Sequence, residues 1–495
     1  MHIPNGGSVP RADVPVLSFR EFRESVILAV ERGARVAAFF GTPADADAIR
    51  LTAVVAHADA GDFSVVATDV AGRYPSLTPD CPQVHLFERD IQEQWGIRPE
   101  GHPWPKPVCF APPRRGSTPT EPILPGVTDY FRVEGEEIHE VAVGPVHAGV
   151  IEPGHFRFQC HGERVLHLEI SLGYQHRGIE RALTGGPGPR SIHYMETLAG
   201  DTTIGHVTAY CQIMEALGGG AVPARAEALR GAALELERLA NHTGDLGALA
   251  GDVGFLPTLS FCGRLRGDFL NLTAMLCGSR FGRGLVRPGS VLFDLDEARV
   301  GKLLDRLGET ARDVAGAAEL LWNTPSVLAR FEDTGAVSRE TAEALGLVGV
   351  AARASGLERD ARFDFPAGIY RTAQIPVSSW QSGDVFARAW VRWLEIQRSV
   401  EFLREQLRAL PEGPVTAPCG PAAPDRIALA MVEGWRGEIC HVALTGADGR
   451  FERYAVVDPS FHNWTGLAMA LRNEEISDFP LCNKSFNLSY AGHDR

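Results

Sequence analysis

The sequence predicts an α+β fold, with a small N-terminal α+β domain over 1–110 and a large, mainly α-helical domain over 131–495 that includes small antiparallel β-sheets. Three observations support this. Short β-rich runs alternate with amphipathic stretches in the first hundred residues, prolines crowd 111–126, and helical periodicity dominates 181–410. A proline-dense segment cannot supply ladder hydrogen bonds, so we predict an exposed linker over 111–130.

The first domain is expected to pack helices on a small sheet. Apolar residues such as Phe22 and Val26 recur with helical spacing, which predicts a helix over 17–32 that rests on the sheet. The β-rich runs over 35–40, 51–57 and 63–68 predict strands, with a Gly- and Asp-containing turn before the last of them. An acidic helix is predicted over 87–95, ending before Gly96.

The second domain begins with strands and continues with helices. Strands are predicted over 131–143 and 156–174, the latter folded at a turn over 160–163. Long helices are predicted over 195–217, 224–249, 300–322 and 385–410. A second proline-rich loop over 411–424 then leads to a final hairpin over 439–457.

Composition excludes several classes of protein. The 495 residues carry 48 basic and 62 acidic side chains, and a net charge of −14 argues against a nucleic-acid binder. No apolar run of about 18 residues and no secretory leader are present, so we expect a cytoplasmic chain with no direct membrane span. The nine cysteines are dispersed without any Cys-x-x-Cys, so spacing predicts no iron–sulfur or zinc site.

Two predicted helices carry charged stripes on otherwise apolar surfaces. The first stripe consists of Glu235, Arg238, His242 and Asp245, which share one helical face. The second consists of Arg388, Arg392, Glu395 and Arg398. Since the remaining faces are apolar, both helices should be buried, and the stripes could pair across a bundle. A structural ion-pair network is the favoured interpretation, and a functional cleft is the alternative.

A Gly- and Pro-rich loop carries Glu152 and His155, and His176 and Arg177 follow the next predicted strand. A carboxylate and an imidazole held by such a loop could relay protons, because both can titrate near neutral pH. An ordinary polar turn is the competing interpretation. No phosphate-binding glycine loop opens a βαβ unit, so no nucleotide-binding site is predicted within this chain.

Several segments together resemble the large subunits shared by respiratory complex I and the energy-converting [NiFe] hydrogenases. The matching segments, in family order and spacing, are 144–147, 152–158, 176–180, 235–242, 281–288, 383–385 and 458–464. Residues 87–97 and 101–103 resemble the small hydrophilic subunit that accompanies the large one. The chain therefore looks like a fusion of the two subunits.

The resemblance places four altered residues at the positions of the metal ligands. Family hydrogenases hold nickel and iron with thiolates from two Cys-x-x-Cys pairs, because soft sulfur suits those metals. The corresponding positions here are occupied by Ala199, Thr202, Ser489 and Gly492. The resemblance therefore implies that this chain binds no nickel–iron centre and no other cofactor of its own.

The complex I relatives differ from this chain as well. In them a second His in the loop and a Tyr near the first ligand position bind the quinone headgroup. Here the loop 148–155 has a hydrogenase-like sequence, and Gly200 stands near the Tyr position. The chain is thus similar to cysteine-lacking relatives of both groups.

The resemblance implies a peripheral subunit on the inner face of the cell membrane. Its expected partners are a subunit carrying an iron–sulfur cluster and antiporter-like membrane subunits that translocate ions. We expect the cleft to pass electrons to a quinone or another organic acceptor, with protons supplied by Glu152, His155, His176 or Arg177. The alternative is a catalytically inert structural subunit of such a complex.

Overall fold

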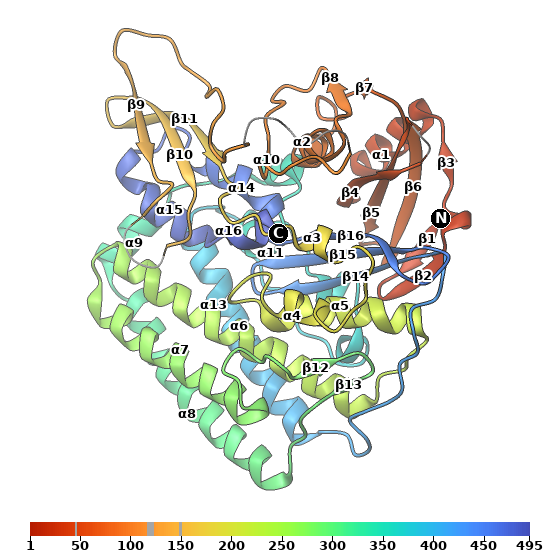
Figure 1. The fold of residues 1–495 in the computed structure, drawn as a ribbon. Helices are drawn as coiled ribbons and strands as arrows, with labels where there is room; N and C mark the ends of the chain where they lie inside the picture. The colour runs from red at the N-terminus through yellow and green to blue at the C-terminus, as the bar shows by residue number, and fades with distance from the viewer. Residues whose placement is uncertain (45–46, 116–122, 148–150) are drawn as a thin grey trace.

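The computed structural model describes residues 1–44, 47–115, 123–147 and 151–495 (Figure 1). It confirms the α+β class, because long helices form one part of the molecule and small antiparallel sheets the other. The middle of the predicted linker, 116–122, and part of the loop 148–155 lie outside the described residues.

The N-terminal sheet forms as predicted, with extra strands at its edge. Its order is β1 (His2–Pro4), β6 (Asp62–Val70), β5 (Ile49–His57) and β4 (Arg35–Pro43), and β3 (Val16–Leu17) pairs in parallel with β6. Helix α1 (Phe19–Glu31) buries Phe22 and Val26 and begins at a capping box of Ser18 and Glu21. Helix α2 (His85–Trp95) ends at Gly96, whose φ of 69° suits glycine. A parallel pair joins β7 (Arg73–Pro75) to β8 (Arg98–Glu100).

A second sheet has the order β11 (Arg164–Ser171), β10 (His155–His161), β9 (Ile138–Val143). The strand predicted from residue 131 was wrong at its start, since β9 begins only at 138. The preceding backbone bonds to side chains instead of a ladder: the amide of Phe131 donates to Glu169 at 2.7 Å, and that of Val133 to Gln159 at 3.4 Å. The segment therefore lies along β11 and β10 without joining the sheet.

Long helices pack side by side in the lower half of the view (Figure 1). They are α6 (Ala224–Asp252), α7 (Leu256–Cys277), α8 (Glu297–Trp322) and α13 (Val385–Arg408). Three of these four confirm predicted helices, and α8 and α13 begin at the capping carboxylates of Asp296 and Asp384. Helix α7 was not predicted as an element of its own.

The helix predicted over 195–217 is broken. Helix α4 (Ser191–Glu196) includes only the first two residues of this range, and α5 (Thr203–Gly218) starts only at Thr203. The carboxylate of Glu237 on α6 accepts the amides of Ile204 and Gly205 at 2.7 and 3.2 Å, so a group from a different helix caps α5. Burial raises the pKa of Glu237 to about 8. The break leaves 197–202 as a loop.

The predicted C-terminal hairpin belongs to a larger sheet. Its order is β16 (Phe451–Val457), β15 (Gly437–Thr445), β14 (Arg426–Gly434) and β2 (Gly7–Pro10). Strand β2 comes from the predicted first domain, so the two predicted domains share a sheet. They share an apolar core as well, in which Phe22 and Val65 join Ile427 and Phe461. The boundary near residue 110 thus separates sequence segments that pack tightly together.

Helices α14 (Pro459–Ala470), α15 (Phe479–Phe486) and α16 (Tyr490–Asp494) bring the C-terminus to the centre of the view (Figure 1). The remaining elements are α3 (Ile179–Ala182), β12 (Val286–Arg287), β13 (Ser290–Val291), α9 (Pro325–Phe331), α10 (Arg339–Leu345), α11 (Gly349–Ala354), α12 (Ala361–Asp364) and 3-10 helices at Arg11–Asp13, Pro82–Val84, Gly368–Arg371 and Ile476–Asp478. None of the helices in the described residues is both long and apolar enough for a membrane span.

Replacing Asn5 by Ala tests whether the two predicted domains depend on each other. The buried Asn5 amide donates to the carbonyls of Phe365 and Met431 at 2.7 and 2.9 Å and accepts the Met431 amide at 2.7 Å. Because the replacement leaves these buried groups unpaired, we expect a loss of about 2–4 kcal/mol in the free energy of unfolding. Denaturant titration measures it.

The matched control is Asn323→Ala, at an exposed position after α8, with an expected change below about 0.5 kcal/mol. Equal stabilities of the two variants would contradict the role of Asn5 in joining the domains.

Candidate active site

Two segments far apart in the sequence, 197–202 and 489–492, meet at the surface. The guanidinium of Arg177 joins them by donating to the carbonyls of Thr197 and Leu198 at 2.8 and 2.5 Å and, more weakly, to that of Ala491 at 3.4 Å. The neighbouring His176 is exposed, and its Nδ1 donates to the carbonyl of Asp494 at 2.6 Å. The structure therefore brings Arg177 to the place where the altered ligand positions converge.

Arg436, on the turn between β14 and β15, binds Asp201 of the first segment and Asn487, which lies two residues before the second segment. Its guanidinium makes a bidentate ion pair with Asp201 at 2.6 and 2.8 Å and donates to the carbonyl of Asn487 at 2.5 Å. Burial alone would lower the pKa of Arg436, but the Asp201 carboxylate holds it above its usual value. Arg436 is thus a fixed buried cation at the centre of the site.

Glu152 lies beside this ion pair and is half-buried. Its carboxylate accepts the amide of Tyr490 at 3.2 Å. Burial raises the pKa of Glu152, and the neighbouring Asp201 adds to the rise while Arg436 opposes it. A carboxyl group with a raised pKa keeps its proton to a higher pH than an ordinary carboxyl and can therefore act as a general acid.

The four altered ligand positions do not fit a nickel–iron centre. Ala199 and Gly492 have no donor atom, and the hydroxyl of Ser489 accepts the Gly492 amide at 2.9 Å as the N-cap of α16. The Thr202 hydroxyl donates to Asp201 at 3.0 Å. A Cβ on Gly492 would lie 2.6 Å from the Asp458 carboxylate, so no side chain has room there. In the part of the chain that the structure describes, no three His, Cys, Asp or Glu side chains form a metal-binding group.

A buried line of hydrogen bonds leads from Tyr454 to Asp458. The Tyr454 hydroxyl donates to Nδ1 of His441 at 2.9 Å, and Nε2 of His441 lies 3.1 Å from Nδ1 of His206. Nε2 of His206 donates to Asp458 at 3.0 Å. Burial lowers the pKa of His441 well below its usual range, which favours the neutral ring. The line ends at Asp458, which lies beside Gly492 at the candidate site.

His155 makes its hydrogen bonds elsewhere. Its Nδ1 donates to the carbonyl of Gly144 at 3.1 Å, while its Nε2 accepts from Arg157 at 3.2 Å. Burial lowers the pKa of His155, so the ring is neutral with both nitrogens engaged. The structure therefore brings Glu152 and Arg177 together, but it does not bring His155 into the same set of contacts.

The two charged stripes meet across α6 and α13. Glu395 on α13 accepts from His242 at 2.7 Å and from Arg353 at 2.6 Å. Glu235 accepts from Tyr370 at 2.7 Å, and Arg238 donates to the Glu433 carbonyl at 2.7 Å. These side chains are 1% exposed or less, Tyr370 aside at 9%. The contacts match the structural ion-pair network that the sequence favoured.

Asp245, the last residue of the first stripe, connects the ion-pair network to the candidate site. Asp245 accepts from Arg392 of α13 at 2.8 Å and from the side chain of Asn487 at 2.6 Å. Because the carbonyl of Asn487 also holds Arg436, the ion pairs between the helices are continuous with the pair at the candidate site. Helix packing and site geometry therefore depend on each other.

Sequence reasoning missed four residues that build the site: Asp201, Arg436, Asp458 and Tyr490. Asp458 lies in 458–464, one of the segments that resemble the family, and Asp201 and Tyr490 lie next to altered ligand positions. Their positions in the sequence were therefore the only signal for these three residues. Arg436 lies on a hairpin turn, and no sequence signal marked it.

Comparison with known proteins gives the family. The chain is 32% identical over 353 residues to the carbon monoxide-induced hydrogenase of Rhodospirillum rubrum, covering 70% of this chain and 97% of that protein. The family described as "Respiratory-chain NADH dehydrogenase, 49 Kd subunit" matches residues 252–424. The chain belongs to this family. It is also 31% identical to an NADH-quinone oxidoreductase subunit of Clostridium beijerinckii, over 68% of this chain and 91% of that protein.

Another relative matches a larger share of the chain. Formate hydrogenlyase subunit 5 of Escherichia coli is 30% identical over 439 residues, which covers 85% of this chain and 77% of that protein. The chain is therefore related to subunits of both NADH-quinone oxidoreductase and hydrogenase complexes.

Replacing Glu395 by Gln tests the network. Burial opposes ionisation of Glu395, but Arg353, with help from His242 and Arg238, holds its pKa well below the usual range. The neutral amide leaves buried cations uncompensated, so we expect a loss of about 3–5 kcal/mol in unfolding free energy at pH 7. The ionised carboxylate contributes its full stabilisation to the folded state at pH values above the pKa that it has in the unfolded chain, which is about 4.3. The deficit of the variant should therefore shrink as pH falls below that value.

The control for this variant is Glu401→Gln on the same helix, because the Glu401–Arg404 pair is solvent-exposed. Its expected cost is below about 1 kcal/mol. Chemical denaturation of both variants at several pH values gives the comparison, and similar costs at pH 7 would contradict a buried network.

Replacing Gly492 by Ala tests the close approach of Asp458. The added methyl group overlaps the carboxylate, so we expect a loss of about 1–3 kcal/mol, measured as a lower thermal midpoint. Gly200→Ala is the matched control, since a Cβ there meets no atom within 4 Å and the change should stay within about 0.5 kcal/mol. Tolerance of Gly492→Ala would show that the position has room for a ligand side chain.

Proposed function

We propose that this chain is the peripheral redox-module subunit of a membrane-bound, ion-translocating oxidoreductase complex, and that its candidate site works without a nickel–iron centre. The proposal rests on the junction of 197–202 and 489–492. This junction has no thiolate at the four altered positions, and it holds a buried Arg436–Asp201 pair beside Glu152. Hydrogen-bonding and proton-transfer groups occupy the place where the family's sulfur ligands would stand.

The proposed reaction is the reduction of a quinone or similar organic acceptor. Two electrons arrive from an iron–sulfur cluster held by a partner subunit, and two protons convert the two carbonyl oxygens to hydroxyls. Glu152 supplies one proton, because burial raises its pKa and so favours the protonated carboxyl, and solvent water supplies the other. Arg177 and Arg436 stabilise the negative charge that develops on oxygen, since both guanidinium groups are held at this junction.

The relatives support the proposed assembly, since they include subunits of NADH-quinone oxidoreductase and of a membrane-bound hydrogenase. In this proposal, antiporter-like partner subunits hold the chain on the inner face of the membrane. Residues 1–110 take the role of the small hydrophilic subunit, and 131–495 that of the large one.

A catalytically inert scaffold is the second candidate, and one observation favours it. The Arg436 guanidinium is already satisfied by Asp201 and Asn487, and Asp458 already binds His206. A fully paired site can hold two chain segments together without any chemistry. On this view the chain couples its partners mechanically.

The purified complex, assayed with short-chain ubiquinone and menaquinone analogues, decides between the two. For Glu152→Gln we expect at least about 100-fold slower acceptor reduction, at the low end of what general acids contribute. In the unmodified complex the rate should fall as pH rises through the Glu152 pKa, because the carboxyl loses the proton that it donates. The variant should lose this pH dependence.

The control is Glu163→Gln, on the exposed turn before β11, which should leave rate and pH profile unchanged. Unaltered turnover in Glu152→Gln would reject proton delivery by Glu152. An assembled complex that reduces none of the acceptors would support the inert scaffold instead.

A further inference from the structure

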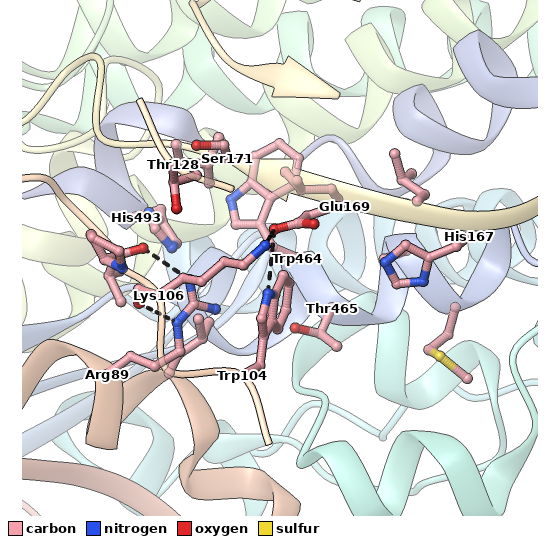
Figure 2. A pocket seen from close by; sticks show the side chains of 18 of the residues that line it. Arg89, Trp104, Lys106, Thr128, His167, Glu169, Ser171, Trp464, Thr465 and His493 are labelled. Carbon is pink, nitrogen blue, oxygen red and sulfur yellow. Dashed lines mark hydrogen bonds and ion pairs between the residues drawn. The ribbon is translucent and has the colours of Figure 1, made fainter. Parts of the chain in front are cut away.

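A cavity of about 220 Å³ lies between the N-terminal unit and the second unit, apart from the residues of the candidate site (Figure 2). The segment 104–110 forms one wall, and β11 and α14 form the others. Most of the lining is apolar, including Leu86, Val108, Phe110, Leu168 and Leu172. At about 30 Å³ per molecule the space would hold about seven waters. It is smaller than the roughly 300–1,000 Å³ of pockets for drug-sized ligands.

Arg89 is a preorganised cation at one end of this cavity. Its Nε and Nη2 donate to the carbonyls of Lys106 and Pro107 at 2.7 and 2.8 Å, and its guanidinium lies 4.5 Å from the ring centre of Trp104. Only 6% of Arg89 is exposed. The third nitrogen, Nη1, has no hydrogen-bond partner among the described residues. A buried guanidinium with a fixed orientation and a spare donor edge is suited to a carboxylate.

Trp464 supplies a second unused donor. Its side chain lines the cavity from α14 and is 3% exposed, and its Nε1–H has no hydrogen-bond partner in the part of the chain that the structure describes. Buried indole N–H groups normally find an acceptor, because leaving one unpaired costs about 1–3 kcal/mol. An acceptor atom of a ligand would remove this penalty.

The charges around the cavity favour an anion. Lys106 and Trp104 both reach the Glu169 carboxylate, at 2.5 and 3.3 Å, on one side of the cavity (Figure 2). Lys106 therefore neutralises Glu169, which is the one Asp or Glu among the described lining residues. Arg89 and the exposed Arg472 are left in excess. His167 lies at the far end of the view from Arg89 (Figure 2), and burial lowers its pKa, so it adds no charge.

We propose that this cavity binds a small organic carboxylate with a flat apolar body. The carboxylate meets Arg89 at one end, the body lies between Trp104, Trp464 and the aliphatic wall, and Trp464 donates to an oxygen of the ligand. The site is independent of electron transfer at the junction of 197–202 and 489–492, so either proposal can fail without the other.

The test titrates the full-length protein with 2-naphthoate and follows binding by isothermal calorimetry. We expect saturable binding of one equivalent, and at least about tenfold weaker binding of the neutral isostere 2-naphthamide, since the charge-assisted bond to Arg89 is lost. Ala468→Phe, which fills the cavity from α14, should abolish binding.

Trp464→Phe removes the unused donor without breaking any hydrogen bond of the described residues, so folding should be retained while affinity falls by about tenfold. The Trp464→Phe variant therefore still tests binding in the cavity if Ala468→Phe fails to fold. Trp380→Phe is the matched control, because Trp380 is 41% exposed and outside the lining, and its affinity should equal that of the unmodified chain.

Three results would overturn the proposal: no saturable binding up to about 1 mM, equal affinity for the amide, or unchanged binding in folded Ala468→Phe or in Trp464→Phe.

Discussion

Ion pairs between α6 and α13 place several full charges in an interior where one uncompensated charge would cost several kcal/mol. Each carboxylate must therefore face its cation, and this requirement sets how the two helices align. Glu395 can reach both His242 and Arg353 in one alignment of α6, α11 and α13, and Asp245 then meets Arg392. Apolar packing tolerates small shifts, whereas charge pairing does not. The network thus holds the helices and, through Asn487, the chain segment that enters the candidate site.

The same constraint explains how a site without thiolates stays intact. The Arg436–Asp201 pair fixes the segment 197–202 to the turn between β14 and β15, and the Asp458–His206 contact joins the start of α14 to α5. These ion pairs and hydrogen bonds hold the surroundings of the candidate site in place. Glu152 differs from these groups, since its raised pKa reflects burial without a full counter-charge. A group that is costly to ionise at an otherwise satisfied junction is the natural place to look for proton chemistry.

The sequence predicted those elements whose signal is local. Helices α1, α6, α8 and α13 follow from apolar periodicity, and β4, β5 and β6 from β-rich runs. The prediction failed where a distant group acts on the backbone. The break at 197–202 depends on the Glu237 carboxylate, the strand at 131 is lost to side-chain hydrogen bonds, and β14 gains β2 from the other end of the chain. None of these long-range contacts can be predicted from the sequence pattern around the residues that make it.

By itself, the sequence determined the chemistry that this chain can offer: residue types decide that Ala199, Thr202, Ser489 and Gly492 bring no sulfur, and that charged stripes occur on buried helices. Only the tertiary structure decided which of those groups meet. It joined Asp201 to Arg436 across 235 residues and set Glu152 against the backbone of Tyr490. It also placed Arg89 and Trp464 in the wall of a cavity. Distances and desolvation arise from packing, and packing is a property of the folded chain rather than of any segment.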